Sequence, residues 1–190
     1  KNFLKKYTPS PLWEFGKKTI RPFRKTTSGY SIIKTPNREQ LKKEWGNTWK
    51  DDSIPQQQQK ITNEQLPNFE EVKHMQVLVD LIKATGLPSP TLLEVGCSTG
   101  YFSEIFEKSR LHVKYSGCDY SPEFVSGAKK CYPAVPFQVC DTTSLSYQDE
   151  SFDIVVSGCC ILHVVDYEKA IAESARTAKE FVIFQRTPVL

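Results

Sequence analysis

The stretch that decides the fold is residues 92–104, LLEVGCSTGYFSE, where an apolar run is followed by an acid and a short turn. TLLEV at 91–95 predicts a buried strand, and the residues after Gly100 predict a helix. Gly96 and Gly100 bracket the turn between them, and glycine lets the backbone adopt positive φ and approach a ligand closely. We therefore predict a loop that can hold a nucleotide-like cofactor.

Strands and helices alternate along the rest of the chain. Upstream, a helix start is expected at Ser53 with Pro55 and an amphipathic helix over 69–85, which Gly86 would end. Further strands are expected at 113–118, 136–140, 152–158 and 180–185, with helices opening at Ser121-Pro122 and spanning 167–179. This alternation predicts an α/β fold with a doubly wound, mostly parallel sheet. Residues 67–190 would form it, and residues 1–66 would form a basic, aromatic and helical N-terminal extension.

Chemically active residues follow the expected strands. In a doubly wound sheet, ligands bind outside the carboxyl ends of the strands, so residues just after each strand are site candidates. The candidates from this rule are Glu94, Gly96, Cys97, Ser98 and Gly100; Asp119; Asp141; and Ser157, Gly158, Cys159 and His163.

The candidate acids suit an adenosine ligand. Asp119 comes 23 residues after Gly96, near the offset of a carboxylate that accepts hydrogen bonds from ribose hydroxyls. Asp141 can accept one from the exocyclic amine of adenine. A nicotinamide dinucleotide would require glycine at positions 96, 98 and 101, whereas Ser98 and Tyr101 occupy two of them. The dinucleotide interpretation is therefore rejected.

Three stretches carry a family resemblance. LLEVGCSTGYFSE resembles the first motif of class I S-adenosylmethionine-dependent methyltransferases, and GCDYSPEFVSGAKK resembles their second-strand motif. FQVCDTTSLSYQDESFDIVVSGCCILHVV resembles their third-strand acid, fourth strand and following loop. The resemblance covers about residues 91–187 in the right order. It implies a Rossmann-like methyltransferase fold, S-adenosylmethionine as cofactor and S-adenosylhomocysteine as product.

The resemblance also implies residue roles. Gly96, Cys97 and Gly100 would frame the methionine part of the cofactor, with Glu94 below the turn. The ribose would lie at Asp119 and Tyr120, the adenine edge at Asp141 and Thr142, and the sulfonium near Ser157. Ser98 departs from the family pattern, which has a glycine there, so a strained φ at Ser98 would weaken binding.

His163 is the one histidine near this predicted site. It is a candidate general base if the methyl acceptor is a hydroxyl. Alternatively, it packs on the cofactor or caps the following helix. Trp45 and Trp49 are candidates for a lid over the cofactor, or for plain core packing.

The acceptor is expected to be a small molecule or a saccharide hydroxyl. Two other interpretations stay open: a non-catalytic binding or scaffold module, and an RNA-directed methyltransferase. The second would use residues 1–34, which hold nine Lys/Arg and one acid among several aromatic residues. SGCC stands after the fourth strand in place of an N/D-P-P-Y/F-type motif, which disfavours methylation of an exocyclic nitrogen on DNA.

Composition limits the remaining classes. The six cysteines form no CxxC pair, so we expect no metal site, and we expect free thiols in a reducing, cytoplasmic compartment. No apolar run reaches the ~20 residues that span a bilayer.

The family sheet has seven strands and this chain of 190 residues stops after the fifth. We therefore expect a truncated sheet that binds cofactor weakly or not at all and self-associates through an uncovered edge.

Overall fold

The computed structural model describes residues 37–45 and 53–187. The chain divides into two compact units, residues 1–48 and 49–190. In the first unit, the described helix is α2 (Arg38–Trp45), where the Asn37 side chain accepts a hydrogen bond from the Glu39 amide at 3.1 Å. The basic arm at 1–34, Trp49 and the side chain of Trp45 lie outside the described residues.

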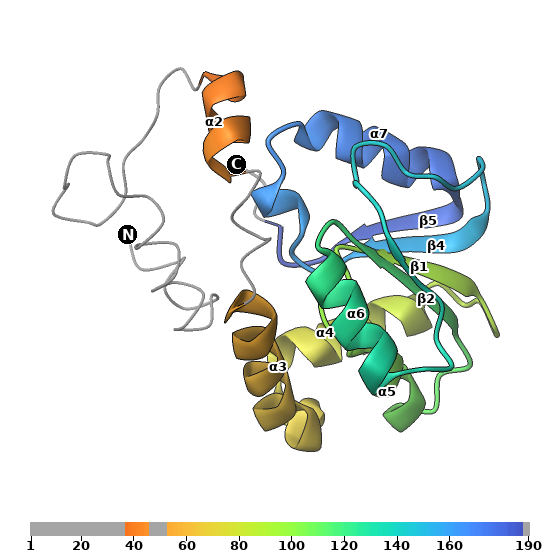
Figure 1. Ribbon diagram of the computed structural model, residues 1–190. Helices are drawn as coiled ribbons and strands as arrows, with labels where there is room; N and C mark the ends of the chain where they lie inside the picture. The colour runs from red at the N-terminus through yellow and green to blue at the C-terminus, as the bar shows by residue number, and fades with distance from the viewer. Residues whose placement is uncertain (1–36, 46–52, 188–190) are drawn as a thin grey trace, which may run out of the picture. The chain divides into compact units, whose positions relative to one another are not determined.

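The second unit is built on one parallel sheet (Figure 1). Its strands lie in the order β3-β2-β1-β4-β5, and every neighbouring pair is parallel. Their bounds are β1 Thr91–Val95, β2 Lys114–Asp119, β3 Phe137–Val139, β4 Phe152–Ser157 and β5 Ala178–Phe184. The predicted α/β class with a doubly wound parallel sheet is confirmed.

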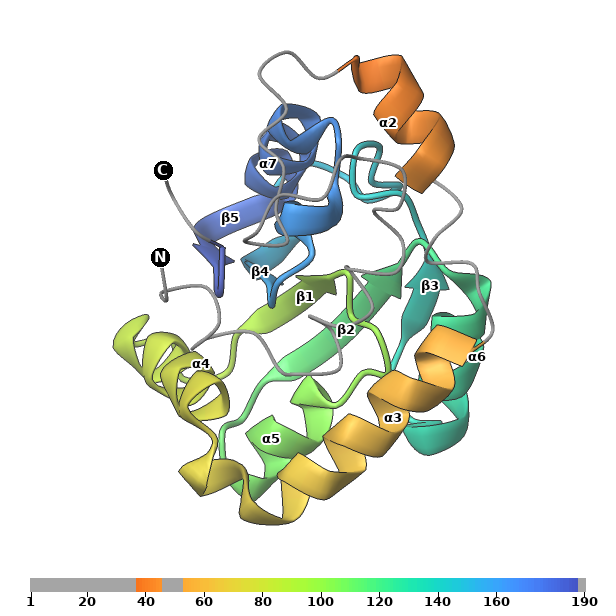
Figure 2. The same ribbon diagram turned by 90° about the vertical axis from the view of Figure 1, so that its left-hand side faces the viewer.

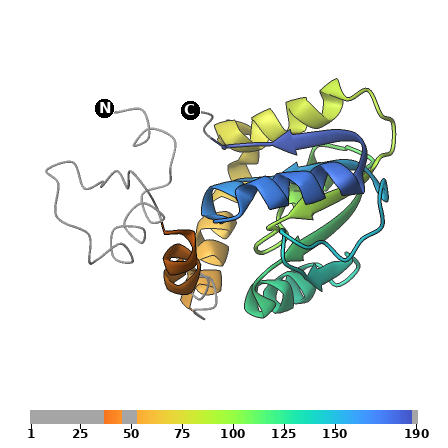
Figure 3. The ribbon, with the colours of Figure 1, turned by 90° about the horizontal axis from the view of Figure 1, so that it is seen from above.

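Helices cover both faces of the sheet (Figure 2). On one face lie α4 (Lys73–Ala84), α5 (Phe102–Lys108) and α6 (Pro122–Cys131), and on the other lies α7 (Tyr167–Thr177). Figure 3 shows α7 running beside β5, and it also contacts β4. The remaining helical segments are α3 (Ser53–Gln65), η3 (Leu66–Glu71) and η4 (Ile161–His163).

The alternation of side chains along β1 explains why the sheet is covered on both faces. Leu92 belongs to the apolar cluster under α4, α5 and α6, whereas Leu93 and Val95 belong to the cluster on the α7 side. All three side chains are 0% exposed. Burying each of these side chains contributes roughly 1.5–3 kcal/mol. A strand whose side chains are apolar on both faces is therefore most stable at the centre of a parallel sheet, where both faces are covered.

The predicted helix over 69–85 is interrupted in the structure. Residues 66–71 form the 3-10 helix η3, and Val72 is extended (φ −87°, ψ 100°) before α4 begins. Pro67 favours a helix start at η3, and the extended Val72 then caps the second start. The predicted end at Gly86 is confirmed, because α4 ends at Ala84 and Gly86 has φ 70°.

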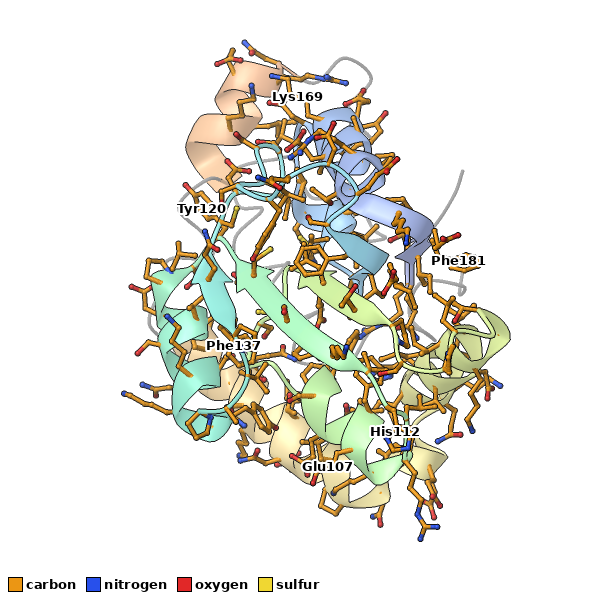
Figure 4. All side chains as sticks on the ribbon, turned by 90° about the vertical axis from the view of Figure 1, so that its right-hand side faces the viewer. Glu107, His112, Tyr120, Phe137, Lys169 and Phe181 are labelled. Atoms are coloured by element: carbon orange, nitrogen blue, oxygen red, sulfur yellow. The ribbon has the colours of Figure 1, made fainter. Side chains whose placement is uncertain are left out.

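The last described strand, β5, was predicted to be buried, but part of it is exposed. β5 begins at Ala178, and its residues 179–181 are exposed, with Phe181 40% exposed on the outer side of the sheet (Figure 4). Within the described residues β5 has β4 as its neighbour and forms an edge, so its other side lacks the packing of a central strand. Self-association through this edge stays a prediction.

In the described ranges 37–45 and 53–187, no helix combines the length and the apolar character needed to cross a bilayer.

Candidate functional site

The predicted site residues gather at one edge of the sheet. The carboxyl ends of parallel strands share an edge, and here this edge carries the residues that follow β1, β2, β3 and β4. Figure 4 shows Tyr120 beyond the carboxyl end of β2 and His112 at the opposite end. Among the described residues no three His, Cys, Asp or Glu side chains are arranged to hold a metal ion.

The turn after β1 requires both of its glycines. The amides of Gly96 and Cys97 donate to the Cys118 carbonyl at 2.8 and 2.9 Å, which ties the turn to β2. Gly96 has φ 72° and Gly100 has φ 75°. A Cβ at position 96 would lie 2.3 Å from the Cys160 Cβ, and one at position 100 would lie 2.5 Å from the Phe137 ring.

Ser98 adopts the strained backbone that its sequence position suggested. Its φ is 50°, in the left-handed region that a non-glycine residue occupies at a cost of roughly 1–3 kcal/mol. Its amide donates to Asp119 Oδ2 at 2.8 Å, a charge-assisted bond that holds the turn in place. Its hydroxyl is buried and has no hydrogen-bond partner.

Asp119 connects the glycine turn to the start of α6. Its second oxygen, Oδ1, accepts from the Ser121 amide at 3.0 Å, and Ser121 caps α6 by accepting from the Phe124 amide at 3.3 Å. The carboxyl is 8% exposed. Burial raises the pKa of Asp119, although the amide hydrogen bonds favour the ionised form. Hydrogen bonds from ligand hydroxyls would stabilise the same ionised form.

Glu94 lies buried beneath the turn. It is 2% exposed and bonded to the Tyr115 hydroxyl at 2.6 Å. Burial, and to a lesser extent the charge of Asp119, raises the pKa of Glu94 well above its usual value. The folded protein therefore holds the proton of Glu94 more tightly than the unfolded chain does.

We expect Glu94→Gln to become more stable relative to the wild type as pH rises. The raised pKa of Glu94 in the folded protein stabilises the fold while Glu94 is protonated, fully so below its pKa in the unfolded chain, near 4.5. This stabilisation is lost as the pH rises through the pKa of Glu94 in the folded protein. Glutamine has no such loss, so urea unfolding should show its advantage growing by about 1 kcal/mol or more between pH 5 and pH 8. Glu107→Gln, at an exposed glutamate, is the control (Figure 4). Parallel pH profiles for Glu94→Gln and wild type would contradict this prediction.

The residues after β3 are divided between solvent and core. Asp141 is exposed, and its Oδ1 accepts from the amide and the hydroxyl of Thr143, both at 2.8 Å. Thr142 is buried. The amide of Cys140 donates to the Asp119 carbonyl at 2.9 Å, so the ends of β2 and β3 are held side by side.

The end of β4 carries buried polar groups. Ser157 is 0% exposed, its hydroxyl has no partner, and its carbonyl accepts from the Gln185 amide at 2.9 Å. At Gly158 an added Cβ would lie 2.5 Å from the Phe102 ring. The hydroxyl of Thr99 in the glycine turn is also buried without a partner. Since buried polar groups are nearly always paired, these hydroxyls indicate a place where a ligand contributes the partner.

His163 lies in η4, after β4. The residue is exposed to solvent, while neighbouring protein atoms desolvate its imidazole, and this desolvation, with the charge of Arg186, lowers the pKa of His163 to about 4. Sequence reasoning did not select Gln185 and Arg186. They directly follow the last strand, so the rule that selected Asp119 and Asp141 would have found them too.

The sequence matches the methyltransferase-domain family over residues 93–183. It is 30% identical over 119 residues to a demethylmenaquinone methyltransferase of Renibacterium salmoninarum, covering 63% of this chain and 48% of that protein. It is 34% identical over 93 residues to norajmaline N-methyltransferase of Rauvolfia serpentina, covering 46% and 32%. The chain thus spans about half, or less, of the length of these relatives.

Two solved structures are also similar to this chain. The YcgJ protein of Bacillus subtilis is 25% identical with a TM-score of 0.51, over 60% of this chain and 50% of that chain. A Methanococcus maripaludis protein assigned to the S-adenosyl-L-methionine-dependent methyltransferases has a TM-score of 0.55 at 18% identity, over 81% and 66%. The second likeness concerns the fold alone.

Proposed function

On the premise of the match to the methyltransferase-domain family over residues 93–183, we propose that the protein is a class I methyltransferase that transfers the methyl group of S-adenosylmethionine to a small molecule. The observation that carries the proposal is the hydrogen bond from the Ser98 amide to Asp119, which joins the glycine turn to the end of β2. It holds in one place the backbone that would surround the methionine part and the carboxylate that would accept the ribose hydroxyls.

The residues at the strand ends fit this cofactor. The buried hydroxyls of Ser98, Thr99 and Ser157 lack partners, and an amino-acid group bound at the turn would offer both donors and acceptors to them. Gly96 and Gly100 keep the turn in a shape that a side chain would disrupt, because an added Cβ would collide with Cys160 at one position and with the Phe137 ring at the other. When bound, S-adenosylmethionine supplies an electrophilic methyl group on a positively charged sulfur.

The role of the protein in the reaction is to position the acceptor. Methyl transfer needs nucleophile, methyl and sulfur in line, and this alignment supplies most of the available acceleration. A base is needed only where the acceptor must lose a proton, as a saccharide hydroxyl does. His163 lies in η4, after the end of β4, and we assign it a positioning contact with the acceptor; its lowered pKa, about 4, makes it neutral at pH 7 and a weak base.

The acceptor class is tested by following the methyl group. The protein is incubated with methyl-tritiated S-adenosylmethionine and, separately, with pooled small metabolites, pooled saccharides and total RNA. We expect label in a small-molecule fraction. Label confined to RNA would overturn the proposal and favour the RNA-directed alternative that residues 1–34 suggest.

A further inference from the structure

We propose that Arg186 binds an anionic group, a carboxylate or a phosphate, on the methyl acceptor. The proposal rests on the proposed function, since it concerns the second substrate of the same site. Five observations support it: the backbone anchoring of residue 185, the unusual backbone of Arg186, its uncompensated charge, its polar neighbours and the order of the strands.

Gln185 fixes the position of Arg186 at the carboxyl edge. Its amide donates to the Ser157 carbonyl at 2.9 Å, and its side-chain amide donates to the carbonyl of His74 in the first turn of α4. Residue 185 is therefore tied to the end of β4 on one side and to α4 on the other. Arg186 follows directly, beside the loop that begins at Gly158.

The backbone of Arg186 is held in a conformation that arginine rarely adopts. Its φ is 59°, in the left-handed region. Ser98 and Cys159 also have positive φ, at 50° and 123°, and both lie at the same edge of the sheet. Such conformations cost roughly 1–3 kcal/mol each and persist where the surrounding structure holds them. Arg110 and Glu150 also have positive φ, at 56° and 53°, before β2 and β4, so the backbone singles out Arg186 only together with its place at the carboxyl edge.

Arg186 is a half-buried residue, and its guanidinium lacks a counter-charge among the described residues. Among residues 37–45 and 53–187, no carboxylate forms an ion pair with it and no acceptor hydrogen-bonds to it. Arg176 shows the contrast, because its guanidinium contacts Glu173 and Asp149, each at 2.8 Å. A partly desolvated arginine without a carboxylate favours a bidentate oxyanion ligand.

The groups whose pKa values respond to the charge of Arg186 add no negative charge at neutral pH. Burial, and then the charge of Arg186, lowers the pKa of His74 and of His163 to about 4, so both imidazoles are neutral at pH 7. Burial raises the pKa values of Tyr101 and Cys159, while Arg186 opposes these increases, so both groups stay protonated. The hydroxyl of Tyr101 and the thiol of Cys159 can donate hydrogen bonds, and the guanidinium of Arg186 supplies one positive charge, so this environment favours an anion.

The strand order indicates which substrate reaches Arg186. With adenine at the end of β3, ribose at β2 and methionine at the turn after β1, the cofactor extends toward β4 and β5. An acceptor must therefore approach the methyl group from the β4–β5 side. Arg186 follows β5, two strands or ~10 Å beyond β1 at the usual strand spacing. It lies where an acceptor substituent would lie, beyond the end of the cofactor.

The test measures anion binding in the full chain saturated with S-adenosylhomocysteine. Inorganic phosphate and acetate are titrated at constant ionic strength, and the imidazole signals of His74 and His163 are followed by NMR. We expect saturable binding in the wild type, with a rise in the pKa of His163. Arg186→Gln should weaken binding at least tenfold, and Arg186→Lys should retain part of it.

Arg110→Gln is the matched control. Arg110 is an exposed arginine with φ 56°, and it lies before β2, at the opposite edge of the sheet. Its replacement should leave phosphate and acetate binding unchanged. If Arg186→Gln also binds the anions as the wild type does, or if all variants lose binding equally, the proposal is overturned.

A second titration separates the acceptor from the cofactor's own carboxylate. S-adenosylhomocysteine carries that carboxylate, and 5′-methylthioadenosine lacks it. We expect Arg186→Gln to bind both as the wild type does. A selective loss of S-adenosylhomocysteine affinity would assign Arg186 to the cofactor and overturn the proposal. A wild type that binds neither nucleoside would instead overturn the proposed function.

Discussion

Asp119→Asn is expected to weaken S-adenosylhomocysteine binding at least tenfold. The carboxylate accepts from the Ser98 and Ser121 amides at 2.8 and 3.0 Å, and it would also accept from the ribose hydroxyls. Asparagine turns an N–H donor toward one of these groups, which leaves a buried donor unpaired at a cost of about 1–3 kcal/mol. Calorimetric titration measures the affinity, and urea unfolding measures the accompanying loss of stability.

Asp153→Asn is the matched control for this loss. Its carboxylate also accepts two hydrogen bonds, from the amide and the hydroxyl of Thr91, both at 2.8 Å. These bonds lower its pKa, and they join β4 to β1 at the edge opposite the site. We expect Asp153→Asn to lose stability while keeping its affinity for S-adenosylhomocysteine. Equal losses of affinity in the two variants would mean that the effect is structural.

Gly96→Ala is expected to destabilise the domain by about 3 kcal/mol or more. The new Cβ would lie 2.3 Å from the Cys160 Cβ and 2.6 Å from its sulfur, at a residue with φ 72°. A left-handed alanine costs roughly 1–3 kcal/mol, and overpacking adds a similar amount. Urea unfolding gives the free-energy change, and the same samples should bind less S-adenosylhomocysteine where they remain folded.

Substitutions at Gly86 and Gly127 separate the backbone cost of Gly96→Ala from the cost of overpacking. Gly86 has φ 70° with nothing within 4 Å of an added Cβ, so Gly86→Ala measures the backbone cost alone. Gly127, inside α6, also has open space, and alanine there should stabilise by up to about 1 kcal/mol. Combining Gly96→Ala with Cys160→Gly should recover the overpacking part. If Gly96→Ala lowers the free energy of unfolding no more than Gly86→Ala does, the prediction of a destabilising contact with Cys160 is contradicted.

Much of the fold could be predicted because its signals are local. The apolar run at β1 and the Ser-Pro start of α6 each specify an element within a few residues. Sequence also indicated which residues would meet, because the parallel order brings strand ends to one edge. The meeting of Asp119 with the glycine turn was predicted in this way, although 21 residues separate it from its partner Ser98.

The parts that could not be predicted depend on contacts between distant residues. The apolar spacing continues through Val72, so the break between η3 and α4 carries no periodic signal. The proposal for Arg186 depends on the hydrogen bonds of its neighbour Gln185 to a carbonyl of β4 and a carbonyl of α4, and on the lack of a described carboxylate paired with Arg186. The exposure of Phe181 likewise reflects its position in an edge strand and is not encoded by its apolar neighbours.

NMR mapping of S-adenosylhomocysteine on the isotopically labelled chain tests the central claim most directly, because it detects weak binding and locates it. We predict saturable shifts of the Ser98, Asp119 and Ser121 amides at the carboxyl edge. The amides of Thr91 and Asp153, at the opposite edge, should not move. Saturable shifts centred on that opposite edge, or none at millimolar ligand, would contradict the assignment of a cofactor site to the glycine turn.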